Sequence, residues 1–303
     1  MMKLIVSGSE SFIGRALQAA CRARGIEVAG FDARPSEAPG HLQLDIRSPH
    51  LDEALPSDAD ALIHLAAISQ DQDCRRDPRL AFEVNVGGTL NLFQAAQRRG
   101  VKQVVFASSE WVYGEVRNDA IQREDTAIDV GRMTSEYALT KIVGERVLAM
   151  ASQRDGPPVT VLRFGIVYGP RPGNWSAVES LFHAVRTQDE VTVGSLATAR
   201  RFVHVTDIAC GILAALGRSG YEIFNVSGEA LITLQDIIEQ SAQLLNRRPQ
   251  VIERNPAAVS IRNPDSRKAR EMLGWAPRVS LRDGLGTLLS AQTEVLDGTR
   301  ASR

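Results

Sequence analysis

Short aliphatic runs alternate with longer amphipathic segments along the first half of the chain. The runs have the length of buried strands, and the segments between them repeat apolar residues at helical spacing. The predicted strands are Lys3–Val6, Glu27–Asp32, Ala61–Leu65, Gln103–Ala107 and Val159–Phe164. The predicted helices are Ile13–Arg24, Pro78–Arg99 and Ser135–Ser152. Because strands alternate with helices, the pattern predicts an α/β protein with a doubly wound parallel sheet.

The pattern changes after Gly169-Pro170. Loops, short strands and short helices follow, and they predict a smaller C-terminal α+β lobe. A later apolar run, Tyr221–Val226, is expected to rejoin the first sheet. We therefore expect a first domain of residues 1–165 with about 202–226, a lobe of residues 166–201 and 227–295, and a frayed tail at 296–303.

Composition and charge narrow the class of protein. The 303 residues carry 35 basic and 36 acidic side chains, a net charge of -1, so no overall field attracts nucleic acid or an anionic membrane. The apolar runs are too short for a signal peptide or a membrane span. Three cysteines, Cys21, Cys74 and Cys210, lie far apart in no Cys/His cluster. We expect a cytoplasmic protein without a metal site.

A glycine turn follows the first predicted strand and begins the first helix. Gly8 makes the turn, and Gly14 lets the helix pack closely on the strand. Backbone N–H groups at that helix N-terminus bind a pyrophosphate well. Ser11 occupies the middle position of this dinucleotide fingerprint, where its side chain either lowers affinity or adds a hydrogen bond. The predicted cofactor contacts are Gly8, Ser11, Phe12, Ile13 and Gly14; a plain strand-to-helix turn is the alternative.

The second strand ends in an acidic residue, Asp32. A carboxylate at this point accepts both ribose hydroxyls of an adenosine and repels a 2′-phosphate, which favours NAD over NADP. Arg34 is the opposing signal, because an arginine beside the strand end accommodates that phosphate.

Further candidate cofactor contacts follow the next apolar stretches. Asp45 and Ile46 are placed to contact the adenine, although an aspartate that caps a turn is the alternative for Asp45. Leu65, Ala66 and Ala67 end the strand after His64. Their small side chains leave room for a cofactor across the strand ends.

Tyr137 and Lys141 lie one helical turn apart in a predicted helix. A phenol has a pKa of about 10, so a base active near pH 7 needs a shift worth roughly 4 kcal/mol. A unit charge about 4 Å away contributes close to that at an effective dielectric of about 20. Ser109, at the end of a strand, is placed to bond a substrate oxygen. The alternatives are a surface pair at i,i+4 spacing for Tyr137 and Lys141 and a turn residue for Ser109.

Together these residues resemble the extended short-chain dehydrogenase/reductase family, in particular its NAD-dependent epimerase/dehydratase branch. The resemblance runs through Gly8–Gly14, Asp32, Asp45, His64–Ala67, Asn85–Thr89, Ser108–Gly114, Tyr137–Lys141, Leu162-Arg163, Val167–Arg171, Arg200–Asp207, Phe224–Val226 and Asp265–Pro277.

The resemblance implies a Rossmann-type domain that holds NAD(P), with Asn85 among its cofactor contacts. It implies Tyr137 as general acid/base, Lys141 on the nicotinamide ribose and Ser109 on the substrate hydroxyl. It also implies a nucleotide-activated sugar as substrate, with Arg200 on the diphosphate and His204 near the nucleotide. Members pair through two helices, here Pro78–Arg99 and Ser135–Ser152, so a homodimer is expected.

Departures from the family pattern bear on the reaction. Ile166 stands where many members carry an asparagine that touches the diphosphate. Trp111 replaces the glutamate of dehydratases and decarboxylating members, and Glu110 lies one residue early. We count Glu110, Trp111 and Ile166 among the candidate substrate contacts. An epimerase is the leading hypothesis, a reductase or dehydrogenase with net redox the alternative, and a non-catalytic dinucleotide-binding protein the third.

Overall fold

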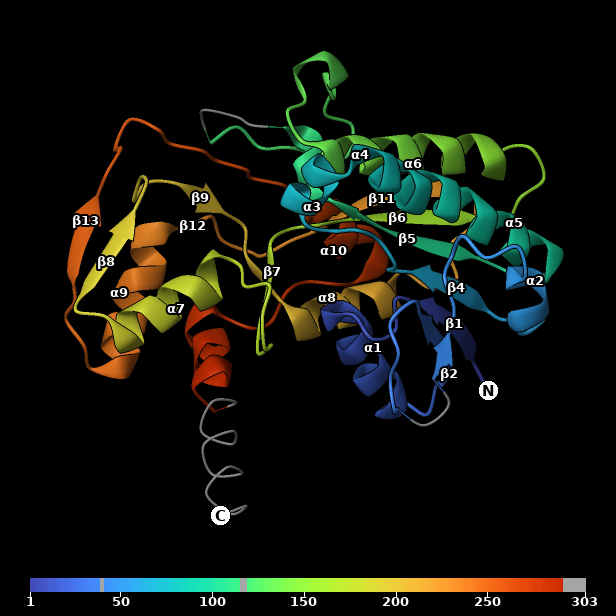
Figure 1. Ribbon diagram of the computed structural model, residues 1–303, viewed down its shortest axis with the longest axis horizontal. Helices are drawn as coiled ribbons and strands as arrows, with labels where there is room; N and C mark the ends of the chain where they lie inside the picture. Colours follow the sequence, from blue (N-terminus) through green and yellow to red (C-terminus); the bar gives the residue numbers. More distant parts are fainter. Residues whose placement is uncertain (39–40, 115–118, 291–303) are drawn as a thin grey trace.

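A seven-stranded parallel sheet forms the centre of the computed structural model, which describes residues 1–38, 41–114 and 119–290 (Figure 1). The strand order is β11-β6-β5-β4-β1-β2-β3, and every pair of neighbours is parallel. The strands are β1 (Lys3–Ser7), β2 (Glu27–Asp32), β3 (Leu42–Gln43), β4 (Ala61–His64), β5 (Val104–Ser109), β6 (Val159–Phe164) and β11 (Tyr221–Val226). The predicted doubly wound parallel sheet is confirmed.

The short edge strand β3 was not expected from the sequence. It has two residues, Leu42 and Gln43, and both are exposed. A strand this short and this exposed shows neither a buried run nor an alternating pattern, so periodicity contains no signal for it.

Helices cover both faces of the sheet (Figure 1). Apolar residues of α1, α8 and α10 pack on one face, and those of α2, α5 and α6 pack on the other. The helices around the sheet are α1 (Phe12–Arg22), α2 (Leu51–Ala54), α3 (Asp71–Arg76), α4 (Pro78–Phe82), α5 (Thr89–Arg98), α6 (Glu136–Ser152), α8 (Val205–Ala214) and α10 (Arg267–Leu273).

The predicted helix Pro78–Arg99 is divided. A π-helical turn (Glu83–Gly88) separates α4 from α5. At Gly88 an added Cβ would lie 2.7 Å from the Ile46 side chain, so the wide turn lets the helix approach the segment after β3. Apolar spacing alone does not distinguish a π turn inside a helix from regular α-helix.

A second group of elements forms a separate apolar cluster around Phe182, Val185, Ile237 and Leu285. Its small sheets pair β7 with β10, β9 with β12 and β8 with β13. The elements are β7 (Val167–Tyr168), α7 (Ala177–Thr187), β8 (Glu190–Val193), β9 (Ala199–Arg200), β10 (Val203–His204), β12 (Ile232–Thr233), α9 (Leu234–Leu245), β13 (Gln250–Glu253) and helical residues 281–290. The expected tail at 296–303 lies outside the described residues.

Within the described ranges, no helix is both long and apolar enough to cross a membrane. In the same part of the chain, no group of three or more His, Cys, Asp or Glu side chains is placed to hold a metal ion.

Candidate cofactor and active site

A cavity of about 670 Å³ opens at the carboxyl ends of β1, β2, β4 and β5. This is the edge of a doubly wound sheet where ligands bind. The structure brings most of the predicted cofactor and catalytic residues to its walls: Gly8, Ser11, Phe12, Ile13, Asp32, Arg34, Asp45, Ile46, Leu65, Ala66, Ala67, Tyr137 and Lys141.

The glycine turn leaves no room for side chains. Gly8 has a φ of 72°, and a Cβ there would lie 2.7 Å from the backbone nitrogen of Ala66. A Cβ on Gly14 would lie 2.3 Å from the carbonyl oxygen of Gly8. The two glycines therefore let α1 start directly against β1 and the segment after β4.

Ser11 has a different role from the glycine that it replaces. It is the N-cap of α1, and its Oγ accepts a hydrogen bond from the backbone N–H of Gly14 at 3.0 Å. Its φ of -68° is one that any residue adopts. The hydroxyl thus satisfies one donor of the first helical turn, while the remaining N–H groups of that turn have no acceptor inside the helix.

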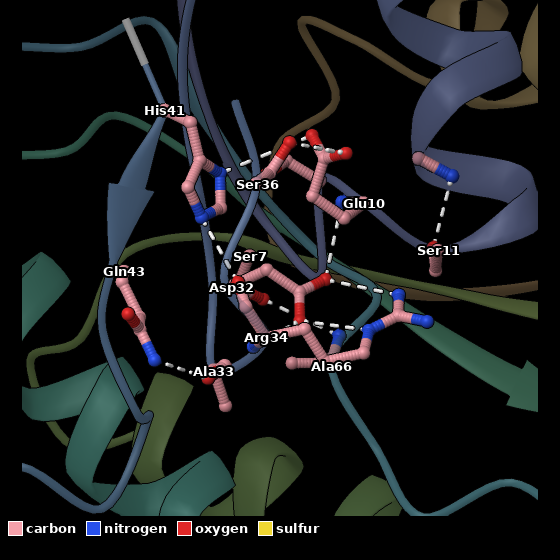
Figure 2. Close-up of polar contacts among 12 residues, drawn as sticks. Ser7, Glu10, Ser11, Asp32, Ala33, Arg34, Ser36, His41, Gln43 and Ala66 are labelled. Atoms are coloured by element: carbon pink, nitrogen blue, oxygen red, sulfur yellow. Dashed lines mark hydrogen bonds and ion pairs between the residues drawn. The ribbon is translucent and has the colours of Figure 1, made fainter. Parts of the chain in front are cut away.

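The two acidic residues at one end of the cavity, Asp32 and Asp45, each have an arginine partner. Asp32 is 7% exposed, and Arg34 donates to it from its backbone N–H, at 3.0 Å, and from its guanidinium, at 3.2 and 3.3 Å (Figure 2). Asp45 accepts the same kinds of bonds from Arg47, at 2.7–3.2 Å. The side-chain bonds from Arg47 lower the pKa of Asp45.

At the opposite end, Tyr137 is half-buried and its phenol faces the Ser109 side chain. Burial raises the pKa of Tyr137 above its ordinary value, and the Ser109 side chain lowers it by less. Lys141 is 4% exposed; its Nζ donates to the Ala107 carbonyl at 2.8 Å and lies 5.7 Å from the centre of the Tyr137 ring. Burial lowers the pKa of Lys141 to about 8.

The expectation that Lys141 brings the Tyr137 pKa down toward 7 is therefore wrong for the protein without ligand. The ammonium points at the carbonyl of Ala107, and removal of water penalises the phenolate more than any neighbouring charge stabilises it. Helical spacing predicted that Tyr137 and Lys141 share one face of a helix, but it contained no information on how far the packed fold removes their side chains from water.

Asn85, His204 and Ile166 are among the predicted contacts that do not line the cavity; the others are Gly14, Ser109, Glu110, Trp111 and Arg200. Asn85 is buried, and its amide bonds the backbone N–H and C=O of Ile68 at 2.8 and 2.9 Å and the Thr140 hydroxyl at 3.0 Å. The Asn85 amide therefore fixes the segment after β4. Ile68 of this segment lines the cavity, whereas Asn85 itself does not. His204 caps α8 through Thr206, and Ile166 packs against the apolar cluster of the second group of elements.

His64, which the sequence places directly before Leu65, is buried between two hydroxyls. Its ring nitrogens lie 2.8 Å from Ser7 Oγ and 2.9 Å from Thr89 Oγ1. Burial lowers the pKa of His64 to about 3. The histidine therefore stays neutral and links β1 to α5.

Glu110 and Trp111 stand directly after Ser109, and the structure adds Arg262 to this group. The Glu110 carboxylate is fully buried, 3.8 Å from the Arg200 guanidinium and 4.0 Å from that of Arg262. Burial raises the pKa of Glu110 to about 7, although the positive charges of Arg262 and Arg200 act to lower it. The Trp111 ring contacts the Tyr137 ring edge-on at 6.4 Å and carries the Arg262 guanidinium 4.5 Å above it.

Two functional candidates were missed from the sequence, Arg262 and Arg171. Arg171 lines the cavity, stacks on Phe12 at 4.4 Å and pairs with buried Glu179 at 2.8 Å. Arg171 ends the segment Val167–Arg171, which carries part of the resemblance but was given no role, and Arg262 belongs to no segment quoted for it. Only the tertiary contacts with Trp111 and Phe12 distinguish them from other arginines.

Comparisons with known proteins agree with this geometry. The family model described as NAD dependent epimerase/dehydratase family matches residues 4–227. The chain is 30% identical to a UDP-glucuronate 4-epimerase of Thermodesulfobacterium geofontis over 74% of this chain and 70% of that protein. It is 26% identical to a GDP-6-deoxy-D-mannose reductase of Pseudomonas aeruginosa over 95% of this chain and 96% of that protein. The structure of MoeE5 in complex with UDP-glucose and NAD is 27% identical, with a TM-score of 0.85 over 97% of this chain and 99% of that one.

NAD is the cofactor, and the residues present fit it. A Cβ at Gly8 or Gly14 would collide with the backbone, so the turn is open only to glycine at these positions. It leads directly into the N-terminus of α1, where backbone N–H groups bind a pyrophosphate well. Carboxylates lie at one end of the cavity and Tyr137 with Lys141 at the other, as the two halves of a dinucleotide require.

The buried Lys141 predicts a pH dependence of stability. Its folded pKa of about 8 lies below the unfolded value of about 10.4, so between these values the unfolded chain binds the proton more tightly. The unfolding free energy of the wild type should therefore rise relative to Lys141→Met by about 1–2 kcal/mol between about pH 7.5 and about pH 9.5. Urea denaturation at both pH values measures it.

Lys102→Met is the control for this experiment. Lys102 is exposed and its pKa is raised by Asp60, so the same comparison should show no rise. An equal rise for both variants would contradict the burial of Lys141 as its cause.

Proposed function

The chain belongs to the NAD dependent epimerase/dehydratase family, and we propose that it is a 4-epimerase of a nucleotide-activated sugar. It is an NAD-dependent enzyme of the extended short-chain dehydrogenase/reductase type. The observation that carries the proposal is the cavity wall, where Tyr137 and Lys141 lie together and Asp32 lies at the other end, with the Ser109 side chain beside the phenol. In this proposal the phenol is the acid/base group at the reacting carbon.

Tyr137 takes the proton of the sugar C4 hydroxyl and later returns it, while Ser109 orients the same oxygen. Bound NAD would supply the hydride chemistry of the reaction. A positive charge near the phenol would oppose the effect of desolvation on the Tyr137 pKa. Lys141 holds the cofactor ribose. The reaction consumes nothing, because the same group removes and restores the proton.

Arg200 and Arg262 support a substrate with phosphate groups. Guanidinium groups bind phosphate through paired N–H donors. The two arginines converge on Glu110, and Arg262 stacks on the ring of Trp111, which in turn contacts Tyr137. An anionic group held there lies close to the reacting tyrosine. Trp111, in place of a glutamate, disfavours a reaction that eliminates water.

A reductase or dehydrogenase with net redox is the second candidate, and the similarity to a GDP-6-deoxy-D-mannose reductase supports it. The same three residues serve both reactions. The two differ in the fate of the nucleotide: the epimerase returns it unchanged, whereas the reductase releases it in the other redox state.

Tyr137→Phe tests the catalytic assignment. Loss of the hydroxyl should lower kcat for interconversion of UDP-sugar C4 epimers by roughly 10²–10⁴-fold, with NAD affinity changed by less than about threefold. Epimer ratios from NMR and NAD titration measure the two quantities. Tyr168→Phe is the control, because that hydroxyl lies near Ser280 and Gly284, in the second group of elements. Accumulation of reduced nucleotide in step with product would favour the reductase.

Arg262→Met tests the phosphate site. We expect KM for the UDP-sugar to rise at least tenfold, since a charge-assisted hydrogen bond contributes about 1.5–3 kcal/mol, while NAD affinity stays the same. Arg267→Met, at an exposed arginine paired with Asp265, should change neither. Equal losses of NAD and UDP-sugar binding would show a general structural defect and contradict the assignment.

We also propose a homodimer that pairs through α5 and α6, which lie side by side on one face of the sheet (Figure 1). Met150, on α6, is 50% exposed. Sedimentation at micromolar protein should show a dimer, and a monomer would contradict the proposal.

The three cysteines are free thiols, which supports a reducing, cytoplasmic location.

A further inference from the structure

A buried carboxylate without a hydrogen-bond partner lies directly after Ser109. The Glu110 side chain is fully buried, and among the described residues neither of its carboxylate oxygens accepts a hydrogen bond. Removal of a carboxylate from water is unfavourable unless other groups replace the water, and most buried polar groups have a partner. The position of Glu110 is therefore costly for the fold, and the groups around it indicate what the cost serves.

Two guanidinium groups face this carboxylate from elements that are far apart in the sequence. Arg200, at the end of β9, lies 3.8 Å from Oε1 of Glu110, and Arg262, in the segment after β13, lies 4.0 Å from the same oxygen. Both distances exceed that of a hydrogen bond, so Glu110 acts on the arginines through its charge. Within the described ranges, these two arginines are the charged groups that act on the carboxylate.

Neither arginine depends on Glu110 for its position. The Arg200 guanidinium donates to two backbone carbonyl oxygens, at 2.8 and 2.6 Å, and to the Ser260 hydroxyl at 2.9 Å. Nε of Arg262 donates to a backbone carbonyl at 3.0 Å, and its guanidinium lies 4.5 Å from the centre of the Trp111 ring. A change in the charge of Glu110 therefore leaves both guanidinium groups in place.

Burial brings the ionisation of Glu110 close to neutral pH. It raises the pKa of the carboxyl group to about 7, although Arg262 and Arg200 favour the carboxylate. A phosphate bound to the same guanidinium groups adds negative charge beside Glu110, which favours the protonated acid. The pKa of Glu110 is therefore higher with such an anion bound than without it.

We propose that Glu110 is a positioning residue of the phosphate site, which balances the charge of Arg200 and Arg262 in the ligand-free enzyme and takes up a proton when a phosphate group binds them. One proton passes from solvent to the carboxylate for each ligand bound, and no other bond changes. The protonated side chain no longer repels the phosphate. The inference rests on the proposed function, because it takes the two arginines as the phosphate site.

Calorimetric titration of the full chain, saturated with NAD, with UDP-glucose measures this proton. The diphosphate of the ligand is esterified at both ends, so it lacks the monoester proton that titrates at about pH 6. Titrations at about pH 8 in HEPES and in Tris, whose heats of ionisation differ, should show an uptake close to one proton for each UDP-glucose. The affinity should fall by roughly tenfold between about pH 6.5 and about pH 8.5, because the carboxylate acquires the proton less readily.

Glu110→Gln removes the titrating group and keeps the size of the side chain. On binding UDP-glucose this variant should take up no proton, and its affinity should be about equal at both pH values and higher than that of the wild type at about pH 8.5.

Glu124→Gln is the matched control. Burial also raises the pKa of Glu124, but this carboxylate accepts from the backbone N–H of Asn225 at 2.7 Å, and the cations that act on it are Lys268 and Arg163. The control should retain the proton uptake of the wild type. Circular dichroism and NAD titration show whether each variant is folded.

Three results distinguish the ways in which this proposal can fail. Binding of UDP-glucose to the wild type without proton uptake would overturn the role of Glu110 and leave the proposed function intact. Proton uptake that persists in Glu110→Gln would also overturn it, because another group then takes the proton. No binding of UDP-glucose or GDP-mannose at either pH would contradict the phosphate site and the proposed function together. The first and third results come from the wild type, so they do not depend on the folding of a variant.

Discussion

The rest of the structure depends on one constraint: the connections that follow two neighbouring parallel strands, β1 and β4, leave toward opposite faces of the sheet. After β1 the chain enters α1 on one face of the sheet, and after β4 it continues to α5 on the other. The crevice between the two connections is the cavity. It stays narrow at the turn because Gly8 lies against the backbone of Ala66, which no other residue type allows.

Removal of water governs the catalytic end of this cavity. Lys141 is buried and Tyr137 is half-buried, and desolvation penalises the charged form of each. Their pKa values therefore move in opposite directions, up for the phenol and down for the ammonium.

Pairs of opposite charge govern the other end. Asp32 and Asp45 each carry an arginine two residues further along the chain, and each pair closes through both backbone and side-chain bonds.

Local pattern determined much of this protein. Apolar runs and helical spacing predicted six of the seven parallel strands and the helices around α1, α4–α5 and α6, because buried elements repeat apolar residues at a regular spacing. The covering helices α2, α3, α8 and α10 were not predicted. The glycine turn, Asp32 and the spacing of Tyr137 and Lys141 were readable because each depends on neighbours within a few residues. Tertiary structure alone decided how these groups behave. Desolvation shifts the pKa values of Tyr137 and Lys141, and contacts across the fold hold the Asn85 amide on the backbone of Ile68. Such contacts also brought Arg262 onto Trp111. Desolvation and contacts between residues far apart in the chain depend on the packed fold, so no local spacing contains them.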